Sequence, residues 1–164
     1  MRAATIIYKT GKVVKLDHVN IDLFLNELQY LVGSNYLTIE SDLVKRVIFN
    51  LNESGLADIF ETGWSTLNNE FIQLIVDKPI ALLKRTKKSI KSADGFGNQA
   101  EFRSAESFFI TIGSKVSEVL KLKKSLNSFP EFTSEIVNFI KLNQMRGHKE
   151  ADLKILIEYC NTLK

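Results

Sequence analysis

The chain has 164 residues, a length that favours one compact domain. Hydrophobic residues make up 45% and charged residues 25% of the sequence, which excludes a generally disordered chain and allows a real core. The formal net charge of +3 permits contact with nucleic acid or with an acidic protein but requires neither. The single cysteine, Cys160, excludes an internal disulfide and a cysteine-rich zinc site.

The apolar runs are short throughout the sequence. None approaches the ~20 apolar residues of a membrane-spanning helix, and residues 1–7 lack the apolar run of a secretory signal. We therefore expect a soluble protein without membrane contact in the reducing cytoplasm. Lys, Asn and Ile are common and Pro occurs only twice, a bias that an AT-rich genome such as that of many phages would produce. For a phage-encoded protein, the location would be the host cytoplasm or the virion.

A β-hairpin is the first predicted element. Residues 5–9 and 12–16 are rich in β-branched and aromatic side chains, and Thr10-Gly11 between them is suited to a turn. Two strands alone are marginally stable in water, so this hairpin should pack on helices or on further strands.

Two helices are predicted next, in residues 20–33 and 40–53. Asn20 is a good N-cap for the first, and Gly33 and Gly55 stand where C-cap glycines are expected. Apolar side chains recur in both segments at the three- and four-residue spacing of a helix face. They are Ile21, Phe24, Leu25, Leu28, Leu31 and Val32 in the first segment, and Leu43, Val44, Val47, Ile48 and Leu51 in the second.

Residues 56–78 are compatible with more than one structure. Residues 56–60 fit a short strand, whereas the apolar residues after 65 fit either a helix or a buried strand, and we favour a helix. Pro79 is suited to the first turn of a further helix that reaches residue 91. The glycine-containing stretch 92–104 is the most loop-like in the chain.

The C-terminal part, residues 105–164, is predicted to be a three-helix bundle. Ser104, Pro130 and Gly147 mark the ends of its helices, and the short connections imply antiparallel neighbours. Ten of its side chains are expected to be largely buried: Phe108, Phe109, Ile112, Val116, Phe132, Ile136, Phe139, Leu153, Leu156 and Cys160. The complete prediction is an α+β, predominantly α fold, with an N-terminal β-hairpin packed on helices (1–91), a loop (92–104) and the bundle (105–164) in one domain, 1–164.

No catalytic or metal-binding constellation is recognisable, so we expect no catalytic residues, no metal and no cofactor. His18 and His148 are interpreted as exposed loop residues, because nothing near either supplies the partners of a hydrolytic triad or of a metal site. Cys160 lies on the predicted apolar face of the last helix and is interpreted as a small buried hydrophobe. Residues 94–98 contain two glycines but lack the remaining residues of a nucleotide-binding loop.

The densest positive charge in the sequence lies in residues 84–91, which we select with the following loop as the partner-binding site. On a helix, Lys84, Lys87, Lys88 and Lys91 would project from one side and meet a phosphate backbone or an acidic protein surface. The alternative is that these cations only offset a helix dipole and keep the face soluble. The complete set of candidate residues is Lys84, Arg85, Lys87, Lys88, Lys91, Phe96, Phe102 and Arg103.

Three functions are compatible with these patterns. The first is a non-catalytic protein-binding or assembly module: an adaptor, an inhibitor or a structural subunit. The second is a nucleic-acid-binding protein, since residues 40–76 resemble winged-helix DNA-binding domains in their order of helix, glycine, strand, turn and strand, although no arginine lies near the turn at Gly63. The third is an enzyme built from carboxylates that are distant in sequence. The partner's identity and the oligomeric state are not predicted.

Overall fold

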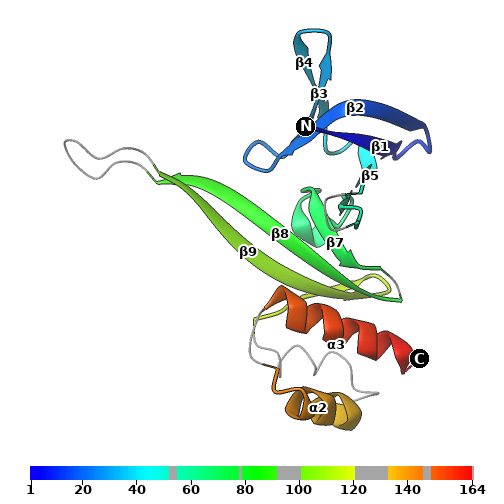
Figure 1. The fold of residues 1–164 in the computed structure, drawn as a ribbon, viewed down its shortest axis with the longest axis vertical. Helices are drawn as coiled ribbons and strands as arrows, with labels where there is room; N and C mark the ends of the chain where they lie inside the picture. The colour runs from blue at the N-terminus through cyan, green and yellow to red at the C-terminus, as the bar shows by residue number, and fades with distance from the viewer. Residues whose placement is uncertain (52–54, 78, 92–100, 121–132, 146–148, 164) are drawn as a thin grey trace, which may run out of the picture. The chain divides into compact units, whose positions relative to one another are not determined.

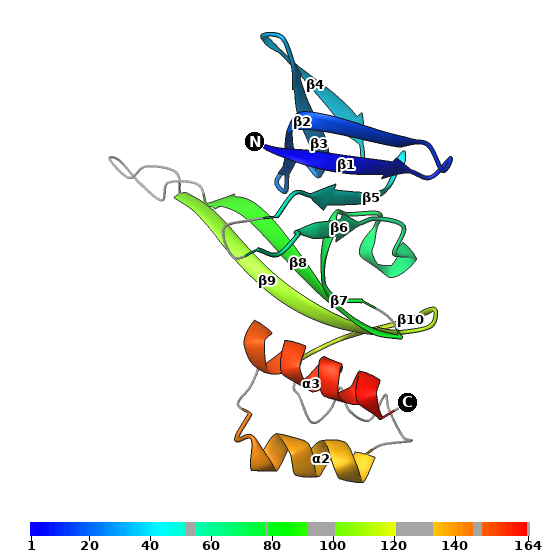
Figure 2. The ribbon, with the colours of Figure 1, turned by 45° about the vertical axis from the view of Figure 1, so that its right-hand side comes forward.

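In a computed structural model, the described part of the chain is mostly antiparallel β-structure with two α-helices (Figures 1 and 2). The structure describes residues 1–51, 55–77, 79–91, 101–120, 133–145 and 149–163. The chain forms two compact units, one of Met1–Gln73 with Thr86–Glu106 and one of Leu74–Arg85 with Ser107–Lys164. The boundaries between the units fall within three strands, β7 (Ile72–Val76), β8 (Ile80–Lys91) and β9 (Glu101–Ile112).

The first unit contains a series of antiparallel strands in the order β6-β5-β1-β2-β3-β4. A 3-10 turn, Ser65–Leu67, follows the last of them in sequence. The strand bounds are Arg2–Tyr8 for β1, Val13–Asp22 for β2, Glu27–Val32 for β3, Asn35–Glu40 for β4, Val44–Phe49 for β5 and Ile59–Glu61 for β6.

One face of these strands carries the core of the first unit. Ala4 and Ile6 are buried in β1 and stand two residues apart, as the alternation of side chains along a strand requires. In β5 the alternation is broken, because Tyr8 pairs with Val44 while Ile7 pairs with Arg46. This β-bulge brings two valines that are three residues apart onto the same core face. The buried members of this core are Ala4, Ile6, Val19, Leu28, Val44, Val47, Phe49 and Phe71.

The second unit combines strands with the two helices. The strands follow the order β10-β9-β8-β7, and β9 and β10 pair antiparallel. On α3 the side chain of Asn161 accepts the N–H of Ile80 at 2.9 Å and donates to its carbonyl at 3.0 Å, so one amide ties the helix to the start of β8. The bounds are Ile72–Val76 for β7, Ile80–Lys91 for β8, Glu101–Ile112 for β9, Lys115–Glu118 for β10, Thr133–Leu142 for α2 and Glu150–Thr162 for α3.

The predicted hairpin is confirmed, because residues 5–8 and 13–16 of the two predicted strands lie in the antiparallel pair β1 and β2. The predominantly helical fold is wrong. Residues 20–33 run through the end of β2, a turn and β3, and the supposed helix at 40–53 contains β5. The short strand allowed at 56–60 overlaps β6, whereas the helix favoured after residue 65 is replaced by the 3-10 turn and β7, and the helix at 79–91 by β8. The described residues between 40 and 76 therefore do not follow the order of elements that resembled a winged helix.

The predicted C-terminal three-helix bundle is also wrong. The segment predicted as its first helix forms the antiparallel strands β9 and β10 instead. The helices α2 and α3 lie where the second and third helices were expected. The burial prediction is largely confirmed despite this. Phe108, Phe109, Ile136, Leu153, Leu156 and Cys160 are buried, Ile112, Val116 and Phe139 are partly buried, and Phe132 lies outside the described residues. Among the described residues, the structure contains no helix that is long and apolar enough to cross a membrane.

The lone cysteine lies in the core of the second unit, as its sequence interpretation predicted. Cys160 is 1% exposed, and burial raises the pKa of its thiol to about 11. Because the thiolate is the reactive form, we expect almost no reaction with a chromogenic disulfide reagent at neutral pH while the protein is folded. Unfolding in guanidinium should release one reactive thiol per chain. Rapid reaction of the folded protein would contradict this placement of α3.

Candidate functional site

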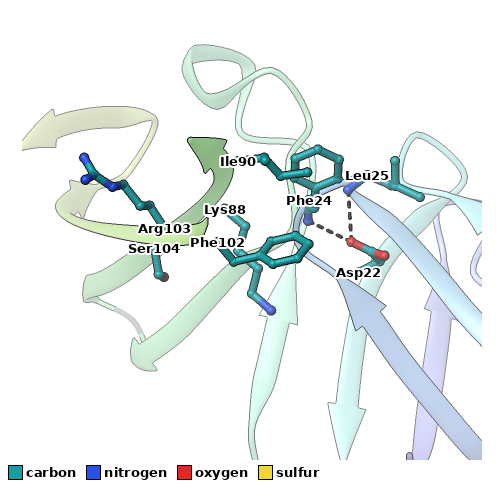
Figure 3. Close-up of a pocket in the computed structure, with 8 residues that line it drawn as sticks. All are labelled: Asp22, Phe24, Leu25, Lys88, Ile90, Phe102, Arg103 and Ser104. Atoms are coloured by element: carbon teal, nitrogen blue, oxygen red, sulfur yellow. Dashed lines mark hydrogen bonds between the residues drawn. The ribbon is translucent and has the colours of Figure 1, made fainter. Parts of the chain in front are cut away.

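A groove of 560 Å³ lies in the first unit, between a turn and the parts of two strands that belong to that unit (Figure 3). Its volume falls within the range of about 300–1,000 Å³ that ligand-binding pockets occupy. We call it the Phe102 groove. It is lined by Asp22, Phe24 and Leu25 from the β2–β3 turn, Lys88 and Ile90 from β8, and Phe102, Arg103 and Ser104 from β9.

The β2–β3 turn is held by the carboxylate of Asp22. Its Oδ1 accepts the backbone N–H of Phe24 at 2.8 Å and of Leu25 at 3.0 Å, as the dashed lines in Figure 3 show. Aspartate commonly stabilises turns by accepting from backbone groups two and three residues later. The consequence is that two large apolar side chains stand at the tip of a turn whose backbone is fixed.

Asn26 fixes the other end of this turn. Its backbone has a φ of 58°, in the left-handed region that asparagine tolerates better than most residues. Its side-chain Oδ1 accepts the N–H of Phe71 at 2.8 Å, and its Nδ2 donates to the hydroxyl of Ser41 at 3.1 Å. The turn that carries Phe24 and Leu25 is therefore attached to two other segments of the same unit.

The opposite wall of the groove comes from β8 and β9. Side chains alternate between the two faces of a strand, so Lys88 and Ile90 share one face of β8. By the same rule Phe102 and Ser104 share one face of β9, while Arg103 lies on the other. Figure 3 shows the guanidinium of Arg103 pointing away from the ring of Phe102.

Four large, exposed apolar side chains line the groove. Phe102 is 72% exposed, Leu25 55%, and Phe24 and Ile90 are each 47% exposed. Single exposed apolar residues are common on soluble proteins, whereas exposed apolar residues that gather at one place are typical of interaction sites.

The charges around the groove are mixed. Lys88 makes no ion pair with another residue in the described part of the chain, whereas Nε of Arg103 lies 3.7 Å from Oε2 of Glu101. The carboxylate of Asp22 is engaged by the turn. Of the described residues that line the groove, the cation that remains for a ligand is therefore Lys88.

The predicted one-sided stripe of lysines does not exist. Because residues 80–91 are a strand, Lys84 and Lys88 lie on one face of β8, and Lys87 and Lys91 lie on the other. The stripe was derived from helical spacing, and the alternation of a strand separates its members.

Several predicted site residues have partners elsewhere. In the second unit, Nζ of Lys84 lies 2.8 Å from Oε2 of Glu150. Arg85, in the same unit, stacks over the ring of Phe109, with the guanidinium carbon 5.0 Å from the ring centroid. In the first unit, Nζ of Lys87 lies 3.6 Å from Oε1 of Glu70, and the side chain of Lys91 is exposed. Phe96 lies outside the described residues.

Three of the eight predicted residues, Lys88, Phe102 and Arg103, meet at the groove. Sequence reasoning missed Phe24, Leu25 and Ile90, because it assigned the first two to the apolar face of a helix and did not use the third. Asp22 and Asn26 on either side of Phe24 and Leu25 were the available signal, since both residue types favour turns.

The other candidate residues offer no competing site. His18 is exposed on β2 rather than in a loop, and His148 lies outside the described residues. Among the residues that the structure describes, no three His, Cys, Asp or Glu side chains are grouped as ligands for a metal ion. The described residues of the Phe102 groove therefore offer apolar contact, the ammonium group of Lys88 and a fixed turn.

Comparisons of the chain with known protein families, with curated proteins and with solved structures give no match. The function must therefore be inferred from the residues of the groove and their physical properties.

Proposed function

We propose that the chain is a non-catalytic protein-binding module whose Phe102 groove receives an acidic segment of a partner protein. The observation that carries the proposal is the group of four large apolar side chains, each 47% or more exposed, around a groove of 560 Å³. Their burial by a partner would be favourable, at roughly 25 cal/mol for each Å² of apolar surface removed from water.

The aromatic residues of the groove support a protein partner. Interface cores are enriched in aromatic side chains, and a few such residues usually supply most of the binding energy. Phe24 and Phe102 come from different segments of the unit and line the same groove. A partner that inserts one apolar side chain would therefore be contacted from both walls.

The charges favour an acidic protein segment over a nucleic acid. Lys88 at the groove complements a carboxylate, and complementary charge increases the rate of association. Contact with a phosphate backbone would need several available cations on one surface. Lys84, Lys87 and Arg103 instead lie beside carboxylates, and β8 divides its cations between two faces.

Asp22, the one carboxylate among the described residues that line the groove, has a structural role. Oδ1 of Asp22 accepts two backbone N–H groups at 2.8 and 3.0 Å, and both bonds hold the turn that presents Phe24 and Leu25. The Asp22 side chain thus shapes the apolar surface of the site.

The proposal is tested by selecting displayed peptides on the immobilised protein, with counter-selection against a Phe102→Asp variant. Enriched peptides should carry aromatic or aliphatic anchors next to Asp or Glu. Phe102→Ala should then weaken their binding about 30-fold, the ratio that corresponds to a hot-spot loss of about 2 kcal/mol. Lys88→Gln should weaken it less, and mainly at low salt. Fluorescence anisotropy of a labelled peptide measures both effects.

Leu142→Ala is the matched control, because it removes an apolar side chain that is 82% exposed in the second unit. This variant should bind the peptides as the unmodified protein does. Peptides that bind the Phe102→Asp variant equally well would contradict the proposal. Binding of a single-stranded oligonucleotide with a steep salt dependence, in the absence of peptide binding, would support the nucleic-acid alternative instead.

A further inference from the structure

The last strand in the order of the first unit, β4, presents an unprotected edge. It pairs with β3 along all six residues without a register shift, and both figures of the fold show no described element on its outer side. Proteins commonly protect such edges with proline, lysine or a bulge. The sequence of β4, Asn-Tyr-Leu-Thr-Ile-Glu, contains no proline and no lysine, and Tyr36 and Leu37 are 68% and 43% exposed.

The turn before β4 shows which backbone groups face outward. Val32 pairs with Asn35 across the two-residue loop Gly33-Ser34, and Gly33 has a φ of 61°. In a hairpin with such a loop, the pair that closes the turn exchanges hydrogen bonds, and bonded pairs then alternate along the strands. The N–H groups of Tyr36, Thr38 and Glu40 therefore point away from β3.

The carbonyl groups of these residues follow the same pattern. The carbonyl of Glu40 accepts the N–H of Leu43 at 3.2 Å, within the turn that follows the strand. Tyr36 and Thr38 keep both their N–H and their carbonyl directed outward. The centre of β4 thus offers a short ladder of donors and acceptors to another strand.

The side chains of β4 match an antiparallel copy of the same strand. With Thr38 opposite Thr38 of the second copy, Leu37 lies opposite Ile39 of that copy, and Tyr36 lies opposite Glu40. Leu37 and Ile39 occupy the face of the sheet whose β3 partners, Tyr30 and Leu28, belong to the core. The pairing would extend that core face, and it would place no like charges opposite each other.

We propose that β4 is a self-association edge, through which two copies of the chain pair antiparallel with Thr38 on the two-fold axis. A two-fold axis makes each contact occur twice, so a self-complementary strand is a natural dimer contact. One pair of six-residue strands buries less than a standard interface of about 1,600 Å², so we expect a weak dimer that forms as the concentration rises. The Phe102 groove does not contribute to this contact.

Sedimentation velocity over a concentration series tests the proposal with two substitutions at one position. Thr38→Pro removes only an outward N–H and should leave the β3–β4 ladder intact, because proline is tolerated on the open side of an edge strand. We expect this variant to stay monomeric. Thr38→Val keeps the N–H and the branched shape, and it should form a dimer as the unmodified chain does. An unmodified chain that stays monomeric throughout, or a Thr38→Pro variant that still dimerises, would overturn the proposal.

A cross-linking experiment tests the register, and it applies even if the proline variant fails to fold. Thr38→Cys places two thiols across the axis, where paired residues lie about 5.5 Å apart, within the range for a disulfide. Tyr36→Cys is the control on the same face, since its two copies would lie about 13 Å apart along the strands. Mild oxidation should produce a covalent dimer from Thr38→Cys alone, because Cys160 is buried. Equal cross-linking of the two variants, or of neither, would contradict the proposed pairing.

Discussion

Leu156→Ala should lower the free energy of unfolding by about 2–5 kcal/mol, the range for truncating a buried leucine. Leu156 is 0% exposed on α3, in the cluster that also contains Leu82 of β8 and Phe108 of β9. The substitution removes the apolar contacts of the side chain and leaves a cavity that the surrounding strands can fill only in part. Urea unfolding followed by circular dichroism measures the loss.

Ile155→Ala, at the adjacent position, is the matched control. Its side chain is 49% exposed, and alanine has a higher helix propensity than isoleucine. We therefore expect a change within about 0.5 kcal/mol in either direction, as for most surface substitutions. Equal losses in the two variants would mean that α3 does not turn the face with Leu156 toward the strands.

The β5 segment shows how a strand can imitate a helix in sequence. Val44 and Val47 are three residues apart, the spacing of a helix face, and both are buried. In a regular strand, residues three apart point to opposite faces. The bulge at the shift between the pairs Tyr8–Val44 and Ile7–Arg46 inserts one residue and restores both valines to the core. Periodicity alone could not reveal this bulge, because it depends on pairing with β1.

Hairpins imitate a helix in a second way. Ile21 and Leu28 are seven residues apart, close to two helical turns, yet they are direct partners across the β2–β3 turn and share a face. The dipeptides Gly33-Ser34 and Gly113-Ser114 were the sequence signal for strands, since glycine followed by serine between β-prone runs is typical of a two-residue hairpin loop. Gly33 was instead interpreted as the C-cap of a helix, and Gly113 lay inside the predicted first helix of the bundle.

The buried residues of the C-terminal part were more predictable than its elements. Phe108 and Phe109 are large and apolar, so a core position was expected of both whichever secondary structure carried them. On a strand, neighbouring residues point to opposite faces, and both rings are nonetheless buried at 7% and 5% exposure. Composition thus identified much of the core, whereas the pairing partners that decide between strand and helix are distant in sequence.

The groove was only partly predictable for the same reason. Lys88, Phe102 and Arg103 were selected for their charge and aromatic character, and those properties do not depend on secondary structure. Phe24 and Leu25 join them because Asp22 holds the turn and because the unit brings residues about 80 positions apart in sequence together. No local pattern encodes that proximity.

Asn26→Ala should lower the free energy of unfolding by about 2–5 kcal/mol, from two separate causes. It leaves the N–H of Phe71, a residue 2% exposed, without its acceptor, and an unsatisfied buried donor costs about 1–3 kcal/mol. It also places an alanine at a φ of 58°, where a residue with a Cβ is disfavoured by about 1–2 kcal/mol. Urea unfolding gives the total loss.

Two further substitutions separate these causes. Asn26→Gly removes the acceptor but adopts the positive φ freely, so its loss should be smaller than that of alanine. Asn26→Asp keeps an acceptor for Phe71 and loses only the donor to Ser41, so it should be the least destabilising of the three.

The expected order of the three variants, from the most to the least stable, is therefore Asp, Gly and Ala. A glycine variant as stable as the unmodified chain would show that the bond to Phe71 contributes nothing, and one as unstable as alanine would show that the backbone conformation carries no cost. Because Asn26 also anchors the turn with Phe24 and Leu25, the alanine variant should weaken binding of selected peptides at the Phe102 groove under conditions in which the protein remains folded.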